Sequence, residues 1–232
     1  MQNKTAIILA GGRGSRLGDL TKETPKPLLT VAGRPFIFHL LDYLDDQGIR
    51  EVILAVGYLG EQFQELLGAN YKNVSIQYSI ETIPLDTGGA LNKALAMSED
   101  ENIFVFNGDT SIKVRLHELE ERHLLTQASL SLCLKFLEDT SRYGRVELEQ
   151  DFVKQICEKG QKEAGFINAG VYLLQRSQWP TMEFKNKKSF SLEKEVFPWF
   201  LQHKKVSYFI SKSNFIDIGT IGDFKRSQTL LG

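Results

Sequence analysis

Short apolar runs alternate with amphipathic stretches along the first half of the chain. The runs predict strands over residues 5–9, 52–56, 74–78, 103–106, 129–136, 145–148, 170–174, 206–210 and 215–218. Between the early runs, apolar residues recur at helical spacing, which predicts helices over residues 35–47, 60–67 and 88–97. Strands that alternate with helices predict right-handed βαβ units and a largely parallel sheet.

The second half of the sequence is richer in strands than the first. We expect an α/β core to which an antiparallel hairpin region is added. No internal repeat, low-complexity tract or Pro/Ser linker divides the sequence, and no hexapeptide repeat follows the core. The pattern therefore predicts one domain over residues 1–232.

The composition is that of an ordinary globular protein, with 42% hydrophobic and 25% charged residues among 232. Lys and Arg number 28 against 29 for Asp and Glu, so the formal net charge is -1. This balance gives no overall attraction to nucleic acid or to an anionic membrane, and we expect neither as a partner.

Sequence features that would indicate secretion or metal binding by cysteine are missing. The two cysteines, Cys133 and Cys157, form no CxxC motif and no Cys/His cluster, so a disulfide framework or a zinc site is not expected. The first apolar run, Ala6 to Ala10, is too short for a signal peptide or a membrane span. We expect a cytoplasmic protein.

A glycine-rich loop follows the first predicted strand and reads Leu9-Ala10-Gly11-Gly12-Arg13-Gly14-Ser15-Arg16-Leu17-Gly18. Such a loop can place backbone N–H groups around phosphate oxygens. It does not fit a Walker A loop, which requires Gly-Lys-Ser/Thr, and it lacks the last glycine of a dinucleotide fingerprint. Taken alone, it is better explained as a turn that carries surface cations.

The loop is followed at short distance by Pro25-Lys26-Pro27-Leu28. Together the two segments resemble the N-terminal signature of the sugar-1-phosphate nucleotidyltransferases, L-A-G-G-x-G-x-R-L followed by P-K-P-L. Fixed cations and backbone amides suit the joining of two phosphoesters, because several negative oxygens must be neutralised. The resemblance implies that Arg16 stabilises the departing pyrophosphate and that Lys26 bridges the α-phosphate and the sugar phosphate.

Two aspartates are similar to the metal ligands of that family. Asp109 follows the apolar run 104–106, at the carboxyl end of a predicted strand, and Asp217 lies in a D-x-G-T element. The resemblance implies that both bind Mg²⁺, which suits one or two carboxylates completed by phosphate oxygens and water. Taken alone, Asp109 is better explained as an Asx turn or the N-terminal cap of a helix, and Asp217 is equally well explained as the N-terminal cap of a helix that begins near Thr220.

The segment Glu81 to Ala90 resembles the family's base-reading loop. The resemblance implies that Glu81 accepts a hydrogen bond from the base and that Gly88 lies against it. Asp86 departs from the pattern, because many relatives have glycine there. For Glu81, a purely structural role in the loop is as well supported. The residues expected at the nucleotide are Leu9, Ala10, Gly11, Gly12, Gly14, Arg16, Lys26, Glu81, Gly88, Asn107 and Asp109.

Three later segments match the family's sugar-binding motifs: Arg142-Tyr143-Gly144, Glu158-Lys159 and Asn168-Ala169-Gly170. The resemblance implies that the sugar contacts Gly144, Glu158, Lys159 and Asn168. A Glu-Lys pair by itself is common on any solvated surface. The four histidines have no spacing that indicates a nucleophile or a metal ligand, and we interpret them as surface or core-edge residues.

The implied fold is a Rossmann-like α/β sandwich. It has a mixed, mostly parallel central sheet and a small β-rich sugar-binding lobe, with the nucleotide-binding part at about residues 1–110 and the sugar-binding part at about 111–232. The implied partners are a nucleoside triphosphate and a sugar 1-phosphate, in a chain that forms a possible homo-oligomer.

The implied reaction gives an NDP-sugar and pyrophosphate. The sequence looks most like the D-glycero-α-D-manno-heptose 1-phosphate guanylyltransferases, which serve capsule or lipopolysaccharide synthesis and use GTP. Alternatives are a mannose-1-phosphate guanylyltransferase, a UTP- or dTTP-dependent hexose enzyme, and a catalytically silent regulatory subunit that binds NDP-sugar. The silent subunit is disfavoured because Arg16, Lys26, Asp109 and Asp217 are all present.

Overall fold

The N-terminal half is built on four parallel strands. They are β1 (Lys4–Leu9), β4 (Ile49–Val56), β6 (Val74–Ile80) and β7 (Asn102–Asn107). They lie in the order β6-β4-β1-β7, which is the order 3-2-1-4 of a doubly wound sheet. This arrangement confirms the expected Rossmann-like core and puts a topological switch point between β1 and β7.

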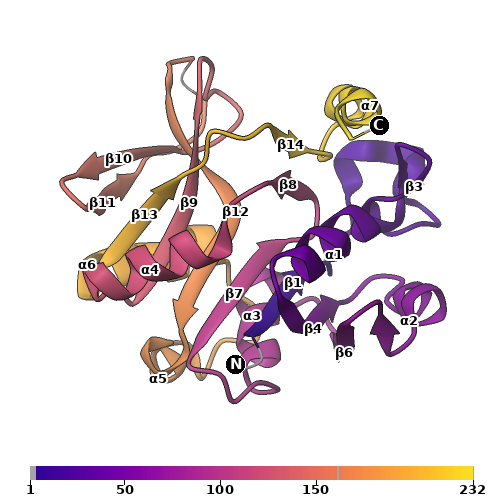
Figure 1. Ribbon diagram of the computed structural model, residues 1–232, viewed down its shortest axis with the longest axis horizontal. Helices are drawn as coiled ribbons and strands as arrows, with labels where there is room; N and C mark the ends of the chain where they lie inside the picture. Colours follow the sequence, from indigo (N-terminus) through magenta and orange to yellow (C-terminus); the bar gives the residue numbers. More distant parts are fainter. Residues whose placement is uncertain (1–3, 161, 232) are drawn as a thin grey trace.

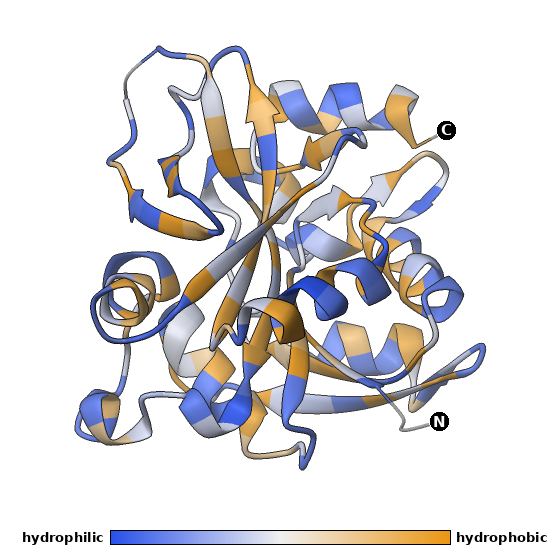
Figure 2. Cartoon of the chain, turned by 60° about the vertical axis from the view of Figure 1, so that its left-hand side comes forward, coloured by the Kyte–Doolittle hydropathy of each residue, from blue (hydrophilic) through white to orange (hydrophobic). Residues whose placement is uncertain are grey.

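Helices cover both faces of these strands (Figure 1). α1 (Phe36–Asp46), α2 (Glu61–Leu67) and α4 (Leu116–Thr126) pack into one hydrophobic cluster, whereas α3 (Asp86–Leu95), α5 (Thr181–Phe184) and α6 (Phe197–His203) pack into another. Successive residues of β1 belong to different clusters: Ile7 to the second and Ile8 to the first. Because β1, β4 and β7 are covered on both sides, they contain nearly continuous apolar runs, whereas β6 alternates buried and exposed residues. Figure 2 shows the central strands largely hydrophobic.

The sheet continues into a small barrel. β12 (Gly165–Gln175) pairs with β7, and β9 (Leu130–Leu137), β13 (Val206–Ile210), β11 (Phe152–Ile156) and β10 (Arg145–Glu149) follow in that order. β10 also pairs with β12, so these five strands close on themselves. With β5 (Asn70–Tyr71) at the opposite edge, the part of the chain that the structure describes contributes ten strands to this sheet.

The prediction of a mostly parallel sheet is wrong. Within residues 4–160 and 162–231, which the computed structural model describes, four strand pairings of this sheet are parallel and six are antiparallel. β12 pairs antiparallel with β7, and all the pairings within the barrel are antiparallel except that between β13 and β9. Hydrophobic periodicity locates a strand but does not indicate the direction of its neighbour. The extent of antiparallel pairing among the barrel strands in the second half of the chain was therefore not predicted.

Smaller elements complete the site region. β8 (Thr110–Ile112) pairs with β14 (Phe215–Asp217), and β2 (Thr30–Val31) pairs with β3 (Arg34–Pro35). Short helical turns lie at Ser15–Thr21, Lys26–Leu28, Arg176–Gln178 and Leu192–Val196. The C-terminal helix α7 (Ile221–Leu230) returns to the N-terminal half, where the Gln228 amide accepts from Ala32 N and donates to Thr30 O, each at 2.9 Å.

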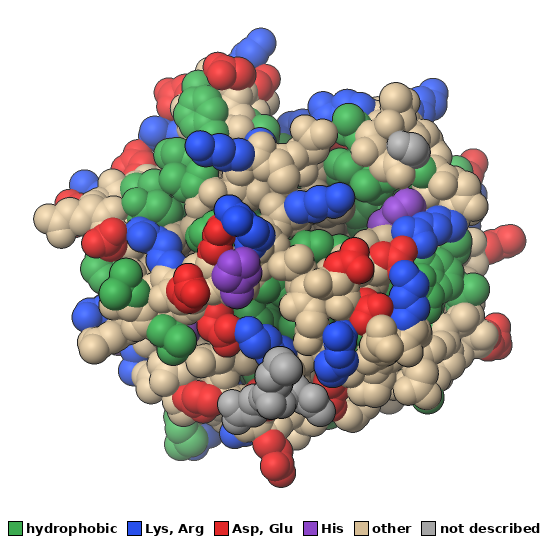
Figure 3. Space-filling view, viewed as in Figure 1, with side chains coloured by type: hydrophobic (Ala, Val, Ile, Leu, Met, Phe, Trp, Pro, Cys, Tyr) green, Lys and Arg blue, Asp and Glu red, His purple; other side chains and the backbone are tan. Residues whose placement is uncertain are grey.

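On the face drawn in Figure 3, Lys and Arg side chains are interspersed with Asp and Glu side chains. Throughout the described ranges, every helix is too short or too polar to cross a bilayer.

Candidate active site

A cleft of about 770 Å³ opens at the switch point between β1 and β7. Its walls come from the glycine-rich loop after β1, the residues after β7, the loop before α3, and the barrel. The predicted site residues that line it are Leu9, Ala10, Gly11, Gly12, Gly14, Arg16, Lys26, Glu81, Asn107, Asp109, Gly144, Lys159, Asn168 and Asp217. The structure therefore brings together residues from the first strand, the middle of the chain and the C-terminal region.

Backbone hydrogen bonds fix the start of the glycine-rich loop. Ala10 N donates to Ala55 O at 2.8 Å, and Gly108 N donates to Leu9 O at 2.9 Å, so the loop departs from the end of the parallel sheet. At Gly11 the chain passes very close to Glu81: a Cβ at this position would lie 2.5 Å from Glu81 Oε1. A larger residue at this position would require the Glu81 carboxylate to move, so glycine suits the close approach.

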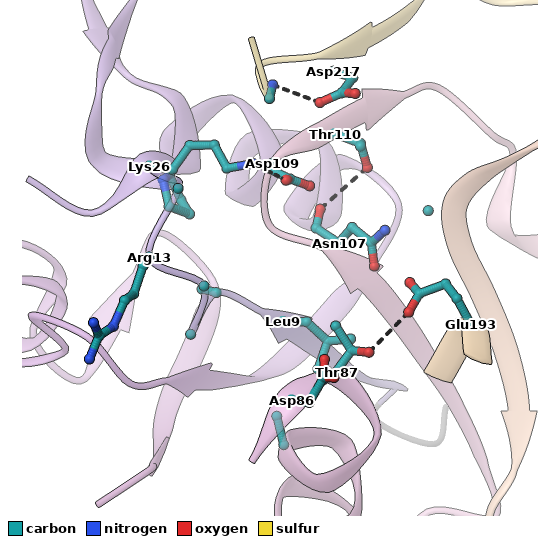
Figure 4. Close-up of a pocket in the computed structure, with 18 of the residues that line it drawn as sticks. Leu9, Arg13, Lys26, Asp86, Thr87, Asn107, Asp109, Thr110, Glu193 and Asp217 are labelled. Atoms are coloured by element: carbon teal, nitrogen blue, oxygen red, sulfur yellow. Dashed lines mark hydrogen bonds and ion pairs between the residues drawn. The ribbon is translucent and has the colours of Figure 1, made fainter. Parts of the chain in front are cut away.

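Lys26 and Asp109 form an ion pair inside the cleft, and Figure 4 shows their side chains pointing toward each other. Lys26 lies in a short helical turn between Pro25 and Pro27, and prolines restrict the backbone there. Its side chain is only 10% exposed, compared with 28% for Asp109. A buried cation next to a partly open carboxylate is suited to hold phosphate oxygens in place with little reorganisation.

Asp217 lies beside Asp109 because β14 runs antiparallel to β8. Ile218 N donates to Asp109 O at 3.0 Å. The Asp217 carboxylate is itself held: Oδ1 accepts from Gly219 N at 2.7 Å, and Oδ2 accepts from Tyr143 Oη at 3.1 Å. Burial and the negative charge of Asp217 raise the pKa of Tyr143, which keeps the phenol protonated as a donor.

Arg16 completes the cationic side of the cleft. A Cβ on Gly219 would lie 3.3 Å from Arg16 Nη2, so the guanidinium approaches the segment that follows Asp217. Within the described ranges no carboxylate lies in ion-pair distance of Arg16. Its planar donors therefore remain available for an anion.

Glu81 lies at the opposite wall of the cleft. Its Oε2 accepts from Leu85 N at 2.9 Å, while Oε1 faces Gly11. Burial raises the pKa of Glu81, and the hydrogen bond from Leu85 partly offsets that effect. The carboxylate thus has one oxygen engaged in shaping the loop and another directed at the glycine-rich loop.

The structure explains the departure at Asp86 and does not support the contact expected for Gly88. Asp86 has a φ of 58°, in the left-handed region that favours glycine, and Asp is among the residues that tolerate it. Its Oδ1 accepts from Thr87 N at 2.7 Å. Gly88 is buried and is not among the lining residues, because its N–H donates to Phe190 O at 2.9 Å.

The barrel side of the cleft carries the predicted sugar residues except Glu158, which is exposed and is not among the lining residues. Asn168 has both amide groups engaged: Nδ2 donates to Tyr172 Oη and Oδ1 accepts from Gly170 N, each at 3.0 Å. Gly170 has a φ of 77° at an irregularity in the β12–β9 register. This irregularity turns Asn168 toward the cleft wall.

Other lining residues were not predicted from the sequence. Arg13 stacks 5.7 Å over the Tyr58 ring. Thr87 Oγ1 donates to Glu193 Oε2 at 3.1 Å, as drawn in Figure 4. Arg13 could have been found because it lies inside the glycine-rich loop. Glu193 follows no recognisable motif and reaches the cleft only through tertiary folding.

One histidine prediction is wrong. His123 is 2% exposed and therefore lies in the core, where Nδ1 is 2.7 Å from Ser131 Oγ. Ser131 Oγ in turn lies 2.7 Å from Ser207 Oγ. Burial lowers the pKa of His123 to about 4. No local pattern indicates this partner, because the serines belong to neighbouring barrel strands.

Comparison with known proteins identifies the class. A sequence model described as nucleotidyl transferase matches residues 5–231. A D-glycero-alpha-D-manno-heptose 1-phosphate guanylyltransferase of Aneurinibacillus thermoaerophilus is 42% identical, with 96% of each chain covered. A protein of the same name from Campylobacter jejuni is 39% identical, with 94% of this chain and 96% of the relative covered.

The solved structures agree. HddC from Yersinia pseudotuberculosis, in a crystal structure complexed with GMP-PN, superposes with a TM-score of 0.86 at 31% identity, and 99% of this chain and 100% of that chain are covered. The chain belongs to the nucleotidyl transferase family, and it is a nucleotidyltransferase enzyme.

Proposed function

We propose that this enzyme transfers GMP from GTP to D-glycero-α-D-manno-heptose 1-phosphate, with release of pyrophosphate. The proposed reaction is supported by one observation: the glycine-rich loop, Lys26, Asp109 and Asp217 line the same cleft at the switch point of the sheet. The choice of GTP and heptose is supported by the two relatives of that name, which match nearly the full length of this chain.

In the proposed reaction, an oxygen of the sugar 1-phosphate attacks the α-phosphorus of GTP. The bond from that phosphorus to the bridging oxygen breaks, and pyrophosphate leaves with the electron pair. The nucleophile already carries negative charge, so no covalent enzyme intermediate and no general base are required. Catalysis then consists of positioning and charge neutralisation.

The residues divide this work between them. The backbone amides of the loop from Gly11 to Gly14 and the Arg16 guanidinium neutralise the leaving pyrophosphate. Lys26 contacts the α-phosphate and the incoming sugar phosphate, which brings the two anions together. Lys159 lies on the barrel side of the cleft and contacts the sugar phosphate.

The donor set fits Mg²⁺. Asp109, directly before β8, and Asp217, at the end of β14, supply carboxylate oxygens. Within the described ranges, no group of three or more His, Cys, Asp or Glu side chains forms a fuller metal site. Two carboxylates suit Mg²⁺, which commonly completes its shell with phosphate oxygens and water. When bound, the ion would polarise the α-phosphate.

Glu81 supports the choice of a guanine base. Guanine presents an imino and an amino donor side by side, and a carboxylate oxygen can accept from either. We expect Glu81→Gln to lower kcat/KM for GTP about tenfold or more, because a site built to hydrogen-bond a substrate discriminates strongly against a lost partner. The exposed Glu65→Gln on α2 is the matched control and should leave kcat/KM unchanged.

The test is pyrophosphate release with Mg²⁺, with GTP, UTP, dTTP, CTP and ATP each combined with heptose, mannose and glucose 1-phosphates. Release with GTP and the heptose phosphate alone supports the proposal. Release with GTP and mannose 1-phosphate would favour the second candidate. That candidate rests on a mannose-1-phosphate guanylyltransferase subunit of Drosophila melanogaster that is 36% identical, of which this chain covers 62%.

The metal is tested separately. Asp109→Asn should abolish Mg²⁺-dependent turnover, whereas the exposed Asp151→Asn should retain it. Unchanged metal dependence in Asp109→Asn would contradict the ligand assignment.

A further inference from the structure

Arg142 reaches the cleft from the loop between β9 and β10. Its Nη1 lies 2.5 Å from Asp223 Oδ2, and its Nη2 lies 3.6 Å from Asp217 Oδ2. The guanidinium also stacks 5.4 Å over the ring of Tyr143. Three contacts therefore fix a cation in place, although its side chain remains 42% exposed.

The position of Arg142 relates the two proposed halves of the site. On one side it contacts Asp217, the proposed metal ligand, and on the other it is two residues from Gly144, which lines the barrel side of the cleft. A sugar 1-phosphate that attacks the α-phosphorus must place its phosphate between these two points. A guanidinium has five N–H donors, and the two carboxylate contacts leave donors free for phosphate oxygens.

The charges in the cleft make a further cation useful. A sugar 1-phosphate brings about two negative charges toward a triphosphate that already carries several, and repulsion must be offset at the point of attack. Lys26 is paired with Asp109, and Lys159 is exposed. Arg142 supplies a guanidinium on the barrel side of the cleft, and its contacts with Asp217, Asp223 and Tyr143 restrict its orientation.

We propose that Arg142 binds the phosphate of the sugar 1-phosphate and that Asp223 is a positioning residue which orients its guanidinium. This inference rests on the proposed function. Asp223 Oδ2 also accepts from Thr220 Oγ1 at 2.6 Å at the start of α7. This hydrogen bond positions the Asp223 carboxylate independently of its contact with Arg142. Through Asp223, helix α7 thereby contributes to the binding of the sugar 1-phosphate.

A purely structural role makes a different prediction. If Arg142 only fastened α7 to the barrel, removing either partner of the ion pair would have the same effect. If Arg142 contacts phosphate, its loss removes the contact, whereas loss of Asp223 only loosens the guanidinium. Comparison of the two single variants therefore separates the two roles.

The experiment measures steady-state kinetics of Arg142→Gln, Arg142→Lys and Asp223→Asn with saturating Mg²⁺. Matched controls are Arg122→Gln and Asp151→Asn. Arg122 also pairs with an aspartate, at 3.0 Å from Asp151, and stacks 4.9 Å over Tyr208, but it lies outside the cleft. We expect Arg142→Gln to raise the KM for the sugar 1-phosphate by tenfold or more and to leave the KM for the nucleotide within twofold.

Asp223→Asn should raise the KM for the sugar 1-phosphate by only two- to threefold, and Arg142→Lys should fall between the wild type and Arg142→Gln. Equal defects in Arg142→Gln and Asp223→Asn, or parallel increases in both KM values, would overturn the inference. If Arg142→Gln does not fold, the KM for the sugar 1-phosphate is compared between Arg142→Lys and Asp223→Asn. A higher KM in Arg142→Lys supports the phosphate contact, and an equal or lower KM overturns it.

Calorimetric titration with mannose 1-phosphate and with free mannose separates this inference from the proposed function. If wild type shows no turnover with any substrate pair, the proposed function fails. Weaker binding of mannose 1-phosphate by Arg142→Gln would then still support the phosphate contact, and equal binding by both proteins would refute it. Free mannose, which lacks the phosphate, should show no difference between the proteins.

Discussion

Gly170 offers the most direct test of how the fold shapes the cleft. Its φ of 77° lies in the left-handed region, and an added Cβ would lie 2.6 Å from Thr110 Oγ1 and 2.9 Å from Asn107 Nδ2. Both distances are below normal contact. Gly170→Ala therefore introduces backbone strain and a collision with residues of the cleft wall.

The two costs can be separated with Gly48, which has a φ of 80° and no atom within 4 Å of the place that a Cβ would take. Left-handed backbone costs an alanine about 1–2 kcal/mol, and overpacking adds about 1–3 kcal/mol. We expect Gly48→Ala to lose about 1–2 kcal/mol of unfolding free energy and Gly170→Ala to lose about 2–5 kcal/mol. Both substitutions also restrict the unfolded chain, and this effect cancels in the comparison.

Urea unfolding of both variants at pH 7 gives the two free energies directly. The same variants should be assayed for turnover, because displacement of Asn107 and Thr110 should lower kcat/KM in Gly170→Ala and not in Gly48→Ala. Equal losses of stability in the two variants would refute the collision, and with it the close packing of β12 against the end of β7.

Three further predictions concern single residues. Lys26→Ala should reduce kcat/KM by roughly 100-fold or more with the fold retained, since a preorganised charge contact is lost, and near-normal turnover would contradict its role; the exposed Lys22→Ala is the control. Asp86→Ala should lower the unfolding free energy by about 1–2 kcal/mol and Asp86→Gly by less, because glycine tolerates the positive φ; the reverse order in urea unfolding would exclude that explanation. His123 should make the fold less stable as the pH falls from 6.5 to 4, because its pKa of about 4 keeps it neutral in the folded state while the unfolded chain takes up a proton. Between pH 6.5 and 4, the unfolding free energy of the wild type should fall by roughly 3 kcal/mol more than that of His123→Gln. Urea unfolding at several pH values measures this difference, and parallel curves for the wild type and His123→Gln would argue against a neutral buried histidine.

Much of the fold follows from local pattern. The runs at β1, β4, β6 and β7 and the amphipathic stretches at α1, α2 and α3 predicted the parallel βαβ units of the first half. β1, β4 and β7 are largely apolar because they are covered on both faces, whereas β6 alternates. The direction of β12 did not follow. Side-chain periodicity is the same for parallel and antiparallel strands, and the direction depends on which strand is its neighbour.

The sequence by itself determined the class of chemistry: a glycine-rich loop, Lys26 and two strand-end aspartates in a recognisable order. Only the tertiary structure decided how these residues meet. The pairing of β14 with β8 puts Asp217 beside Asp109, and the Phe190 carbonyl takes the Gly88 N–H away from the cleft. Arg142 became informative only when the fold placed it against Asp217 and Asp223, because an ion pair between distant segments leaves no periodic trace in the sequence.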